Sequence, residues 1–158
     1  MNVGIITVSD RAAAGEYEDQ GGPALISEAT RRGWRVVADA LVADEKVAIQ
    51  EAIHSFSAQG CGLILTTGGT GIAHRDVTPE AVREIMRVEI PGFGELMRMR
   101  SVEITPNAIL SRGLAAVVEN SLVITLPGKP KGAVECLGFV EGALEHAVKL
   151  CVGEPTSC

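Results

Sequence analysis

Short apolar runs alternate along the chain with segments in which apolar residues recur at helical spacing. The runs from Val3 to Val8, from Arg35 to Val42 and from Leu63 to Leu65 predict strands. Gly22-Pro23 indicates the start of a helix that Gly33 ends. Another helix is predicted from Glu45 to Gln59, because one of its faces collects the apolar residues Ile49, Ala52, Ile53 and Phe56.

Turn residues interrupt the second half of the chain more often. Two shorter helical stretches are broken at Pro91-Gly92, and a turn-rich segment follows around Thr105-Pro106-Asn107. A hairpin is predicted around Glu119-Asn120-Ser121, with strands from Leu114 to Val118 and from Leu122 to Leu126. The last helix is predicted from about Lys131 to Cys151.

Strands that alternate with helices predict an α/β fold in which helices cover both faces of the sheet. In such sheets, ligands bind outside the carboxyl ends of the strands. If the strand through Leu65 and the strand ending at Leu126 are parallel, four polar turns meet at one edge. These turns are Ser9-Asp10, Asp44, the segment Thr66 to Gly71 and the segment Pro127 to Lys131.

The segment Thr66-Thr67-Gly68-Gly69-Thr70-Gly71 has the composition of an anion cradle. Glycines leave the backbone free of Cβ clashes, so that amide N–H groups can converge on a phosphate, and the threonine hydroxyls are expected to add donors. Thr78 and Pro79 are typical of an N-cap and a first helical residue, which places a helix start beside the loop. With Thr78 as the cap, Asp76 has no evident structural role, which favours a functional one.

The loop by itself also fits an ordinary solvated turn, since many glycine-rich turns bind nothing. No glycine lies three residues beyond Gly71 to complete GxGxxG, and no Gly-Lys-Ser/Thr follows as a P-loop requires. The sequence therefore disfavours a dinucleotide dehydrogenase and a P-loop kinase.

Composition indicates a compact domain with an aliphatic core. The chain has 158 residues, 46% of them hydrophobic and only 3% aromatic, so we expect residues 1–158 to form a single domain. The net charge of −6 argues against nucleic acid or an anionic membrane as the main partner. Any phosphate site must therefore be built locally.

The cysteines and the N-terminal segment indicate a cytoplasmic protein. The four cysteines have neither CxxC nor zinc-finger spacing, which favours free thiols in a reducing compartment over disulfides or zinc; they are Cys61, Cys136, Cys151 and Cys158. The apolar stretch Val3 to Val8 is too short to span a membrane and lacks a basic flank.

Several motifs in a fixed order resemble one protein family. They are Thr66 to Gly71 with Arg75 to Pro79, then Pro91-Gly92-Phe93-Gly94, Leu110-Ser111-Arg112, and Pro127-Gly128-x-Pro130. With these motifs the chain resembles the molybdopterin adenylyltransferases, which comprise the bacterial MogA and MoaB group, the G domain of gephyrin and the corresponding plant domain. Within this family the chain most resembles the MogA branch, because it also has the motif residues Thr7 to Arg11, Asp19, and Gly21 to Pro23.

This resemblance implies a three-layer α/β/α sandwich with a mostly parallel mixed sheet, assembled as a homotrimer in the cytoplasm. The implied reaction joins AMP from Mg-ATP to the terminal phosphate of molybdopterin and releases pyrophosphate. A molybdenum-insertion protein is then a candidate to receive the product. The phosphate that attacks is already largely ionised near neutral pH, so Mg²⁺, amides and cations are expected to matter more than a general base.

The resemblance also carries roles over to individual positions. It implies catalytic roles for Asp44, Asp76 and Ser101, with Asp44 and Asp76 as Mg²⁺ ligands. Together with the cradle composition, it gives as substrate- and nucleotide-binding residues Ser9, Asp10, Thr67, Gly68, Gly69, Thr70, Gly71, Pro127, Gly128 and Lys131.

Each of these roles has a structural alternative. Asp44 also fits a helix N-cap, Ser101 an exposed residue at a helix end, and Lys131 a solvent-facing lysine. Ala43 departs from the proline often found before this aspartate, and Arg75 could pair internally or contact phosphate. At the level of the whole protein, the alternative is a non-catalytic molybdopterin-binding or scaffold protein of the same fold.

Overall fold

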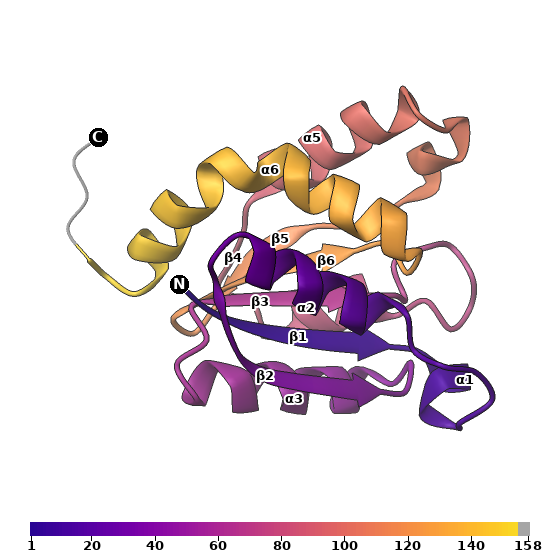
Figure 1. Ribbon diagram of the computed structural model, residues 1–158, viewed down its shortest axis with the longest axis horizontal. Coiled ribbons are helices and arrows are strands. Elements are labelled where there is room, and N and C mark those ends of the chain that lie inside the picture. The colour runs from indigo at the N-terminus through magenta and orange to yellow at the C-terminus, as the bar shows by residue number, and fades with distance from the viewer. Residues whose placement is uncertain (155–158) are drawn as a thin grey trace.

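The computed structural model describes residues 1–154, and these form a six-stranded sheet between two layers of helices (Figure 1). The strand order is β2-β1-β3-β6-β5-β4. The first four strands in this order are parallel; they are β2 (Arg35–Val42), β1 (Asn2–Val8), β3 (Leu63–Thr67) and β6 (Ser121–Leu126). β5 (Ala115–Val118) is antiparallel to β6, and the two-residue β4 (Val88–Glu89) is antiparallel to β5. This is the predicted mixed, mostly parallel sheet.

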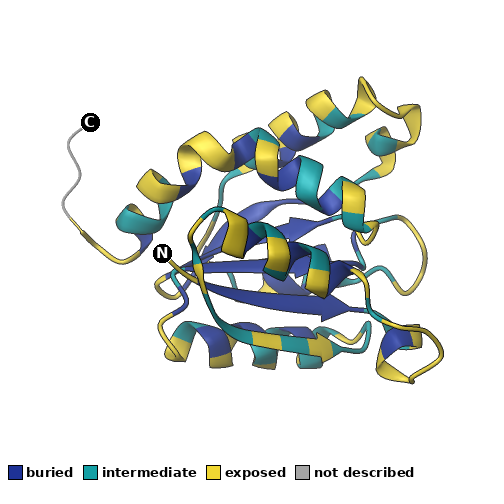
Figure 2. Ribbon diagram, in the orientation of Figure 1, coloured by how far each residue is buried: buried dark blue, intermediate teal, exposed yellow. Residues whose placement is uncertain are grey.

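Helices cover both faces of the sheet, as the alternating pattern predicted. One layer contains α2 (Gly21–Arg31), α5 (Pro91–Val102) and α6 (Pro130–Cys151), and the opposite layer contains α3 (Lys46–Ala58) and α4 (Thr78–Ile85). The central strands are buried throughout, whereas each helix buries only one side (Figure 2). Because β3 and β6 face helices on both sides, their near-continuous apolar character is what a parallel sheet requires.

The core is divided by the sheet into two clusters. On the α2 and α6 side, Leu25 and Leu137 pack with Ile5 and Leu65. On the α3 and α4 side, the predicted helical face packs against the sheet, with Ile49, Ile53 and Phe56 buried and Ala52 partly buried. The two clusters confirm the three-layer arrangement.

Some local predictions need correction. Thr78 is not the N-cap of α4: Val77 takes that position, and the Thr78 hydroxyl donates to the Gly68 carbonyl oxygen instead. Pro91 does more than interrupt a helix, because it begins α5 after the short strand β4. The sequence pattern also missed α1 (Asp10–Ala13), since four residues are too few to show a helical period. The turn-rich segment contains the 3-10 helix η1 (Pro106–Leu110).

The parallel pairing of β3 and β6 sets the position of the site. Leu65 pairs with Ile124 and Thr67 with Leu126, so these two strands end together. β1 ends beside them, because Thr7 pairs with both Thr67 and Leu41. The condition for the four turns to meet is therefore fulfilled.

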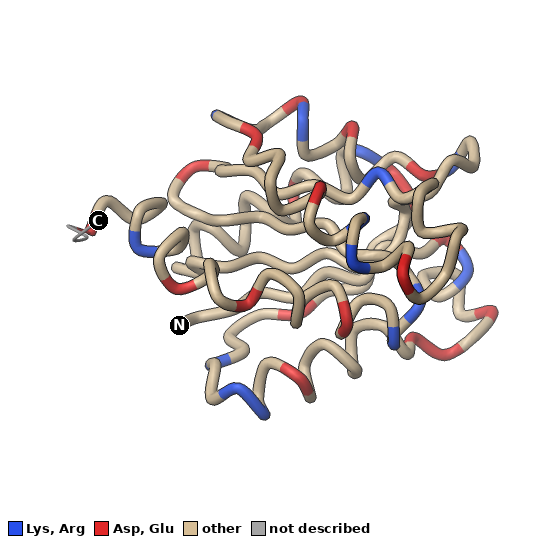
Figure 3. Tube along the Cα trace, turned by 90° about the horizontal axis from the view of Figure 1, so that it is seen from above, with Lys and Arg blue, Asp and Glu red and all other residues tan. Residues whose placement is uncertain are grey.

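Within residues 1–154, none of the helices is both long and apolar enough to cross a membrane. Acidic and basic residues are interspersed along the described part of the chain rather than gathered by sign (Figure 3). Cys61, Cys136 and Cys151 are buried free thiols, and Cys158 lies outside the described residues.

Candidate active site

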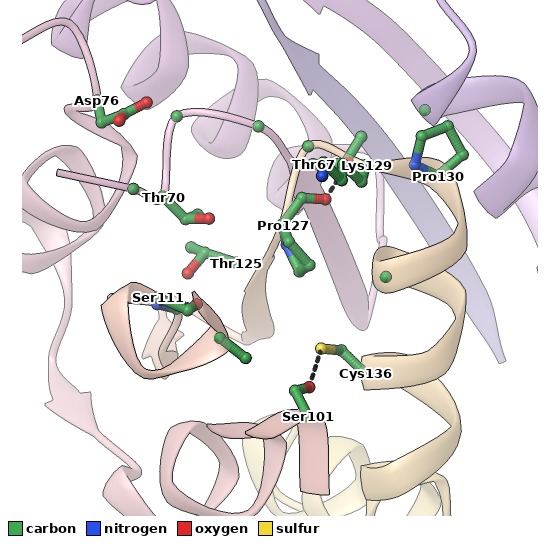
Figure 4. Close-up of a pocket in the computed structure, with 18 of the residues that line it drawn as sticks. Thr67, Thr70, Asp76, Ser101, Ser111, Thr125, Pro127, Lys129, Pro130 and Cys136 are labelled. Carbon is green, nitrogen blue, oxygen red and sulfur yellow. Dashed lines mark hydrogen bonds between the residues drawn. The ribbon is translucent and has the colours of Figure 1, made fainter. Parts of the chain in front are cut away.

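A cavity of about 840 Å³ lies outside the carboxyl ends of the parallel strands. Its walls come from the turns after β1, β2, β3 and β6, together with α5, η1 and the start of α6. The close-up shows these segments surrounding the open space (Figure 4). This is the edge of the sheet at which the alternating strand pattern predicts ligand binding.

All but one of the residues proposed from the sequence line this cavity. They are Ser9, Asp44, Thr67, Gly68, Gly69, Thr70, Gly71, Asp76, Ser101, Pro127, Gly128 and Lys131. Asp10 is the exception. Both oxygens of its carboxylate accept hydrogen bonds from Arg75, and Oδ1 also accepts from the backbone N–H of Asp44. Asp10 therefore supports the loops that surround the cavity rather than lining it.

The glycine loop adopts a backbone that other residues would disfavour. Gly68 and Gly69 have φ values of +105° and +62°. A Cβ atom on Gly68 would collide with the carbonyl oxygen of Val8, and one on Gly69 would lie 3.0 Å from Asp44 Oδ1. The loop thus passes close to both the end of β1 and the Asp44 carboxylate, and only glycine permits this approach.

Two threonine hydroxyls hold the loop in place. Thr67 Oγ1 donates to the Pro127 carbonyl oxygen at 2.8 Å (Figure 4), and Thr78 Oγ1 donates to the Gly68 carbonyl oxygen at 2.9 Å. A hydroxyl has only one proton to donate. The expectation that the Thr67 hydroxyl donates to an anion is therefore not met in this conformation, and its role is to join β3 to the turn after β6.

Asp44 is a partly buried carboxylate that is not a helix cap. The N-cap of α3 is Glu45, and Asp44 Oδ2 accepts from the backbone N–H of Asp10 at 2.8 Å. Burial raises the pKa of Asp44, and the negative charges of Asp10 and Asp76 raise it further. Asp44 therefore favours a cation in the cavity.

Asp76 has a structural contact that the sequence did not reveal. Its Oδ2 accepts from the backbone N–H of Ala73 at 2.8 Å, which stabilises the exposed turn after the glycine loop. The view that Asp76 lacks any structural role is therefore wrong. Its carboxylate nevertheless lines the cavity (Figure 4).

The two aspartates fit the oxygen ligands that Mg²⁺ prefers. Among the described residues, Oδ1 of Asp44 and Oδ1 of Asp76 have no hydrogen-bond partner. No group of three or more His, Cys, Asp or Glu side chains within residues 1–154 could hold a metal ion. Two carboxylates suffice for Mg²⁺, because this ion takes its remaining ligands from phosphate and water.

Arg75 forms internal ion pairs at the rim. Its guanidinium donates to Asp10 from Nε at 2.9 Å and to Glu45 from Nη2 at 2.7 Å. The hydrogen bond from Arg75 lowers the pKa of Asp10. Of the two alternatives for Arg75, the structure shows the internal ion pairs. These pairs connect the turn after β3 to the turns after β1 and β2.

Helices α5 and α6 contribute Ser101, Cys136 and Lys131 to the cavity wall. Ser101 lies in the last turn of α5, with its Oγ 3.5 Å from Cys136 Sγ (Figure 4). Burial raises the pKa of the Cys136 thiol, which keeps it protonated near neutral pH. The ammonium of Lys131 lies 3.8 Å from Glu135, and its side chain is 85% exposed, so it is free to reach toward an anion.

Several residues that line the cavity were not predicted from the sequence as site residues. They are Tyr17, Asp19, Arg98, Asn107, Ser111 and Thr125. Asp19 and Ser111 lie within or beside motifs already quoted, so the resemblance could have suggested them. Tyr17 lies 3.4 Å from Ser9, and as the one tyrosine of the chain it offers an aromatic ring at the rim. Hydrophobic periodicity could not have found it, because it lies in a loop.

Comparison with known proteins identifies a family over most of the chain. A family model described as a probable molybdopterin binding domain matches residues 4–146. A molybdopterin adenylyltransferase from Helicobacter pylori is 43% identical over 157 residues, covering 97% of this chain and 89% of the relative. The protein of the same name from Escherichia coli K12 is 40% identical over 152 residues, covering 94% and 77%.

Solved structures agree with the sequence relatives. The molybdopterin biosynthesis enzyme MoaB from Thermus thermophilus superposes with a TM-score of 0.90 at 44% identity, covering 99% of each chain. A MogA structure superposes with a TM-score of 0.89 at 36% identity, covering 96% of this chain and 99% of that one. The chain therefore belongs to the molybdopterin-binding family of molybdenum cofactor biosynthesis that contains the MogA and MoaB proteins.

Proposed function

We propose that the protein is a molybdopterin adenylyltransferase, which transfers AMP from ATP to the terminal phosphate of molybdopterin. The observation that carries this proposal is the meeting of Asp44, Asp76, the glycine loop and Lys131 around one cavity. Relatives named for this activity, at 40% identity or more over nearly the whole chain, support it. One MoaB structure is equally similar, at 44% identity, so an activity measurement has to decide between the MogA and MoaB branches.

In the proposed reaction, an oxygen of the terminal phosphate of molybdopterin attacks the α-phosphorus of ATP. A new phosphorus–oxygen bond forms, and the bond from the α-phosphorus to the bridging oxygen breaks, so that pyrophosphate leaves. The nucleophile needs little deprotonation, since a phosphate monoester has a second pKa near 6. The main obstacle is therefore the repulsion between two polyanions.

The residues around the cavity suit this electrostatic task. The Gly68–Gly71 loop lines the cavity, where its backbone would face a bound phosphate, and the exposed ammonium of Lys131 supplies positive charge at the same cavity. Asp44 and Asp76 would hold Mg²⁺, which neutralises phosphate charge when it is bound. Ser101, in the last turn of α5, offers a hydroxyl to one of the substrates.

The same proposal covers the wider setting. We infer that residues 1–158 act as a single cytoplasmic domain, that the protein assembles as a homotrimer, and that it passes its product to a molybdenum-insertion protein. Neither nucleic acid nor a membrane is proposed as a partner. These inferences rest on the family rather than on contacts within one chain.

The test is adenylyl transfer by the purified protein. The protein is incubated with molybdopterin, MgCl₂ and ATP labelled at the α-phosphate, and the products are separated to detect labelled pterin. The proposal requires labelled pterin and an equal amount of pyrophosphate. Molybdopterin binding without labelled product would instead establish the alternative, a non-catalytic binding or scaffold protein.

A further inference from the structure

Arg112 connects both ends of the exposed loop that carries Asp76. Its backbone N–H donates to the Thr70 carbonyl oxygen at 2.9 Å. From its guanidinium, Nε donates to the Gly71 carbonyl oxygen and Nη2 donates to the Asp76 carbonyl oxygen, both at 2.6 Å. One residue, distant in sequence and placed between η1 and β5, thus binds the loop where it leaves the glycine cradle and where it returns.

Apart from Arg112, the loop is held from outside by Arg75, whose guanidinium pairs with Asp10 and Glu45 at the exposed surface. Residues 72–75 are exposed, and the Ile72 side chain is 68% exposed and thus buries little apolar surface. Ala73 and Asp76 exchange two hydrogen bonds, but both lie within the loop itself. Segments with few buried contacts and solvent-exposed hydrogen bonds open easily. The position of Asp76 therefore depends on bonds from outside the loop.

The guanidinium is well suited to this task. The Arg112 side chain is only 33% exposed, and its Nη1 pairs with Glu80 on α4. Its planar fork of five N–H donors can serve two carbonyls and a carboxylate in fixed directions. A lysine ammonium at the same place would keep the charge but could not hold the same three acceptors.

Arg112 acts on the cavity without lining it. Among the described residues, it contributes to a smaller neighbouring hollow with Arg83 and Glu89, whereas Asp76 and Gly71 line the main cavity. The bond to the Asp76 carbonyl oxygen fixes the backbone of the very residue whose carboxylate faces the cavity.

We propose that Arg112 is a positioning residue that keeps the Gly71–Asp76 loop in place so that the Asp76 carboxylate and the glycine cradle present one preformed surface to the phosphates. Its contribution to turnover rests on the proposed function, whereas its effect on the loop does not. Glu80 supports Arg112 from α4 and is the second member of this arrangement.

The test compares Arg112→Lys with Arg83→Lys as a matched control. Arg83 is a neighbouring arginine that pairs with Glu89 and has no hydrogen bond to the loop among the described residues. The first measurement is backbone hydrogen exchange of residues 71–76 in the free protein. We expect exchange in Arg112→Lys to be at least about tenfold faster than in the wild type, and exchange in Arg83→Lys to be unchanged.

The second measurement is the dependence of adenylyl transfer on Mg²⁺ and ATP. In Arg112→Lys we expect kcat to fall about 10- to 100-fold, as when an outer partner of a metal ligand is lost, and half-saturation to need several times more Mg²⁺. For Arg112→Ala, added guanidinium ion is expected to restore part of the turnover. A purely structural loss of stability would lower the active fraction without raising the Mg²⁺ requirement.

Two outcomes would overturn the inference. One is wild-type exchange in residues 71–76 of Arg112→Lys, and the other is faster exchange with an unchanged Mg²⁺ requirement and unchanged kcat. If Arg112→Lys does not fold, Glu80→Gln takes its place, since it leaves Arg112 present but weakens its anchor, and unchanged exchange there would equally count against the inference. If the wild type itself makes no adenylylated pterin, the proposed function fails while the exchange result still decides the role of Arg112 in the loop.

Discussion

Asp10 and Asp44 exchange two hydrogen bonds. The backbone N–H of Asp10 donates to Asp44 Oδ2 at 2.8 Å, and the backbone N–H of Asp44 donates to Asp10 Oδ1 at 2.9 Å. This pair joins the turn after β1 to the turn after β2. It occupies Oδ2 of Asp44, while Oδ1 has no hydrogen-bond partner among the described residues. Two carboxylates that look equivalent in the sequence thus have different positions: Asp10 holds the loops together, and Asp44 lines the cavity.

Asp76→Asn is expected to keep the fold and to lose most of the activity. The amide oxygen of asparagine can still accept from the Ala73 N–H, but the negative charge is gone. We expect kcat to fall roughly 100- to 1000-fold, the range found when one preorganised electrostatic contact is removed. Steady-state kinetics of adenylyl transfer measures this, and wild-type kcat in the variant would rule out a catalytic role.

Oligomeric state provides the control for that variant. Asp76 lines the cavity of a single chain, so we expect the sedimentation coefficient of Asp76→Asn to match that of the wild type. Dissociation of the variant would mean that Asp76 acts in assembly rather than in catalysis.

Asp44→Asn is expected to raise thermal stability at pH 7. Because burial raises the pKa of Asp44 above its value in the unfolded chain, the folded state binds the proton more tightly. Stability of the wild type therefore decreases as the pH rises through the interval between the two pKa values, and asparagine removes this loss. Thermal melts should show a higher Tm for the variant at pH 7 and a shrinking difference toward acid pH. A Tm below that of the wild type at pH 7 would contradict this account.

Gly69→Ala is expected to destabilise the protein. The Gly69 φ of +62° disfavours a residue with a side chain, and the new methyl group would press on Thr78 and Asp44. The cost is estimated at about 1–3 kcal/mol. Gly142→Ala is the matched control, because Gly142 lies in α6 with open space around it and should gain about 0.5–1 kcal/mol. Urea unfolding measures both, and equal stability of the two variants would refute the strained-loop interpretation.

Glu28→Gln is expected to destabilise the protein near neutral pH but not at strongly acidic pH. Hydrogen bonds from Arg31 and then Arg32 lower the pKa of Glu28 to about 2, from 4.5 in the unfolded chain. Its contribution is therefore complete above pH 4.5 and is lost as the pH falls toward 2. At pH 7 we expect a loss of about 1–3 kcal/mol, as for hydrogen bonds to a charged group. Glu145→Gln, on an exposed pair with Lys149, serves as the control and should change little.

Much of the fold follows from local patterns. The apolar runs and the helical face of Ile49, Ile53 and Phe56 depend only on neighbours in the chain, and the structure confirms them. The rule for the carboxyl edge of a sheet then predicted which turns would meet. Weak local signals failed, as with the two-residue β4 and the four-residue α1.

The sequence by itself determined the alternation of strands and helices, the glycine cradle and the family. Only the tertiary structure decided which polar groups already have a hydrogen-bond partner. The Asp10 carboxylate accepts from Arg75, the Thr67 hydroxyl donates to the Pro127 carbonyl oxygen, and the loop carbonyl oxygens accept from Arg112. Thr67 and Pro127 are 60 residues apart, and Arg112 and Gly71 are 41 apart. Partners at such separations are set by the strand order β2-β1-β3-β6 and by the direction of each side chain. The sequence pattern contains neither the strand order nor the side-chain directions. It can therefore predict which residues form a site but not the role of each one.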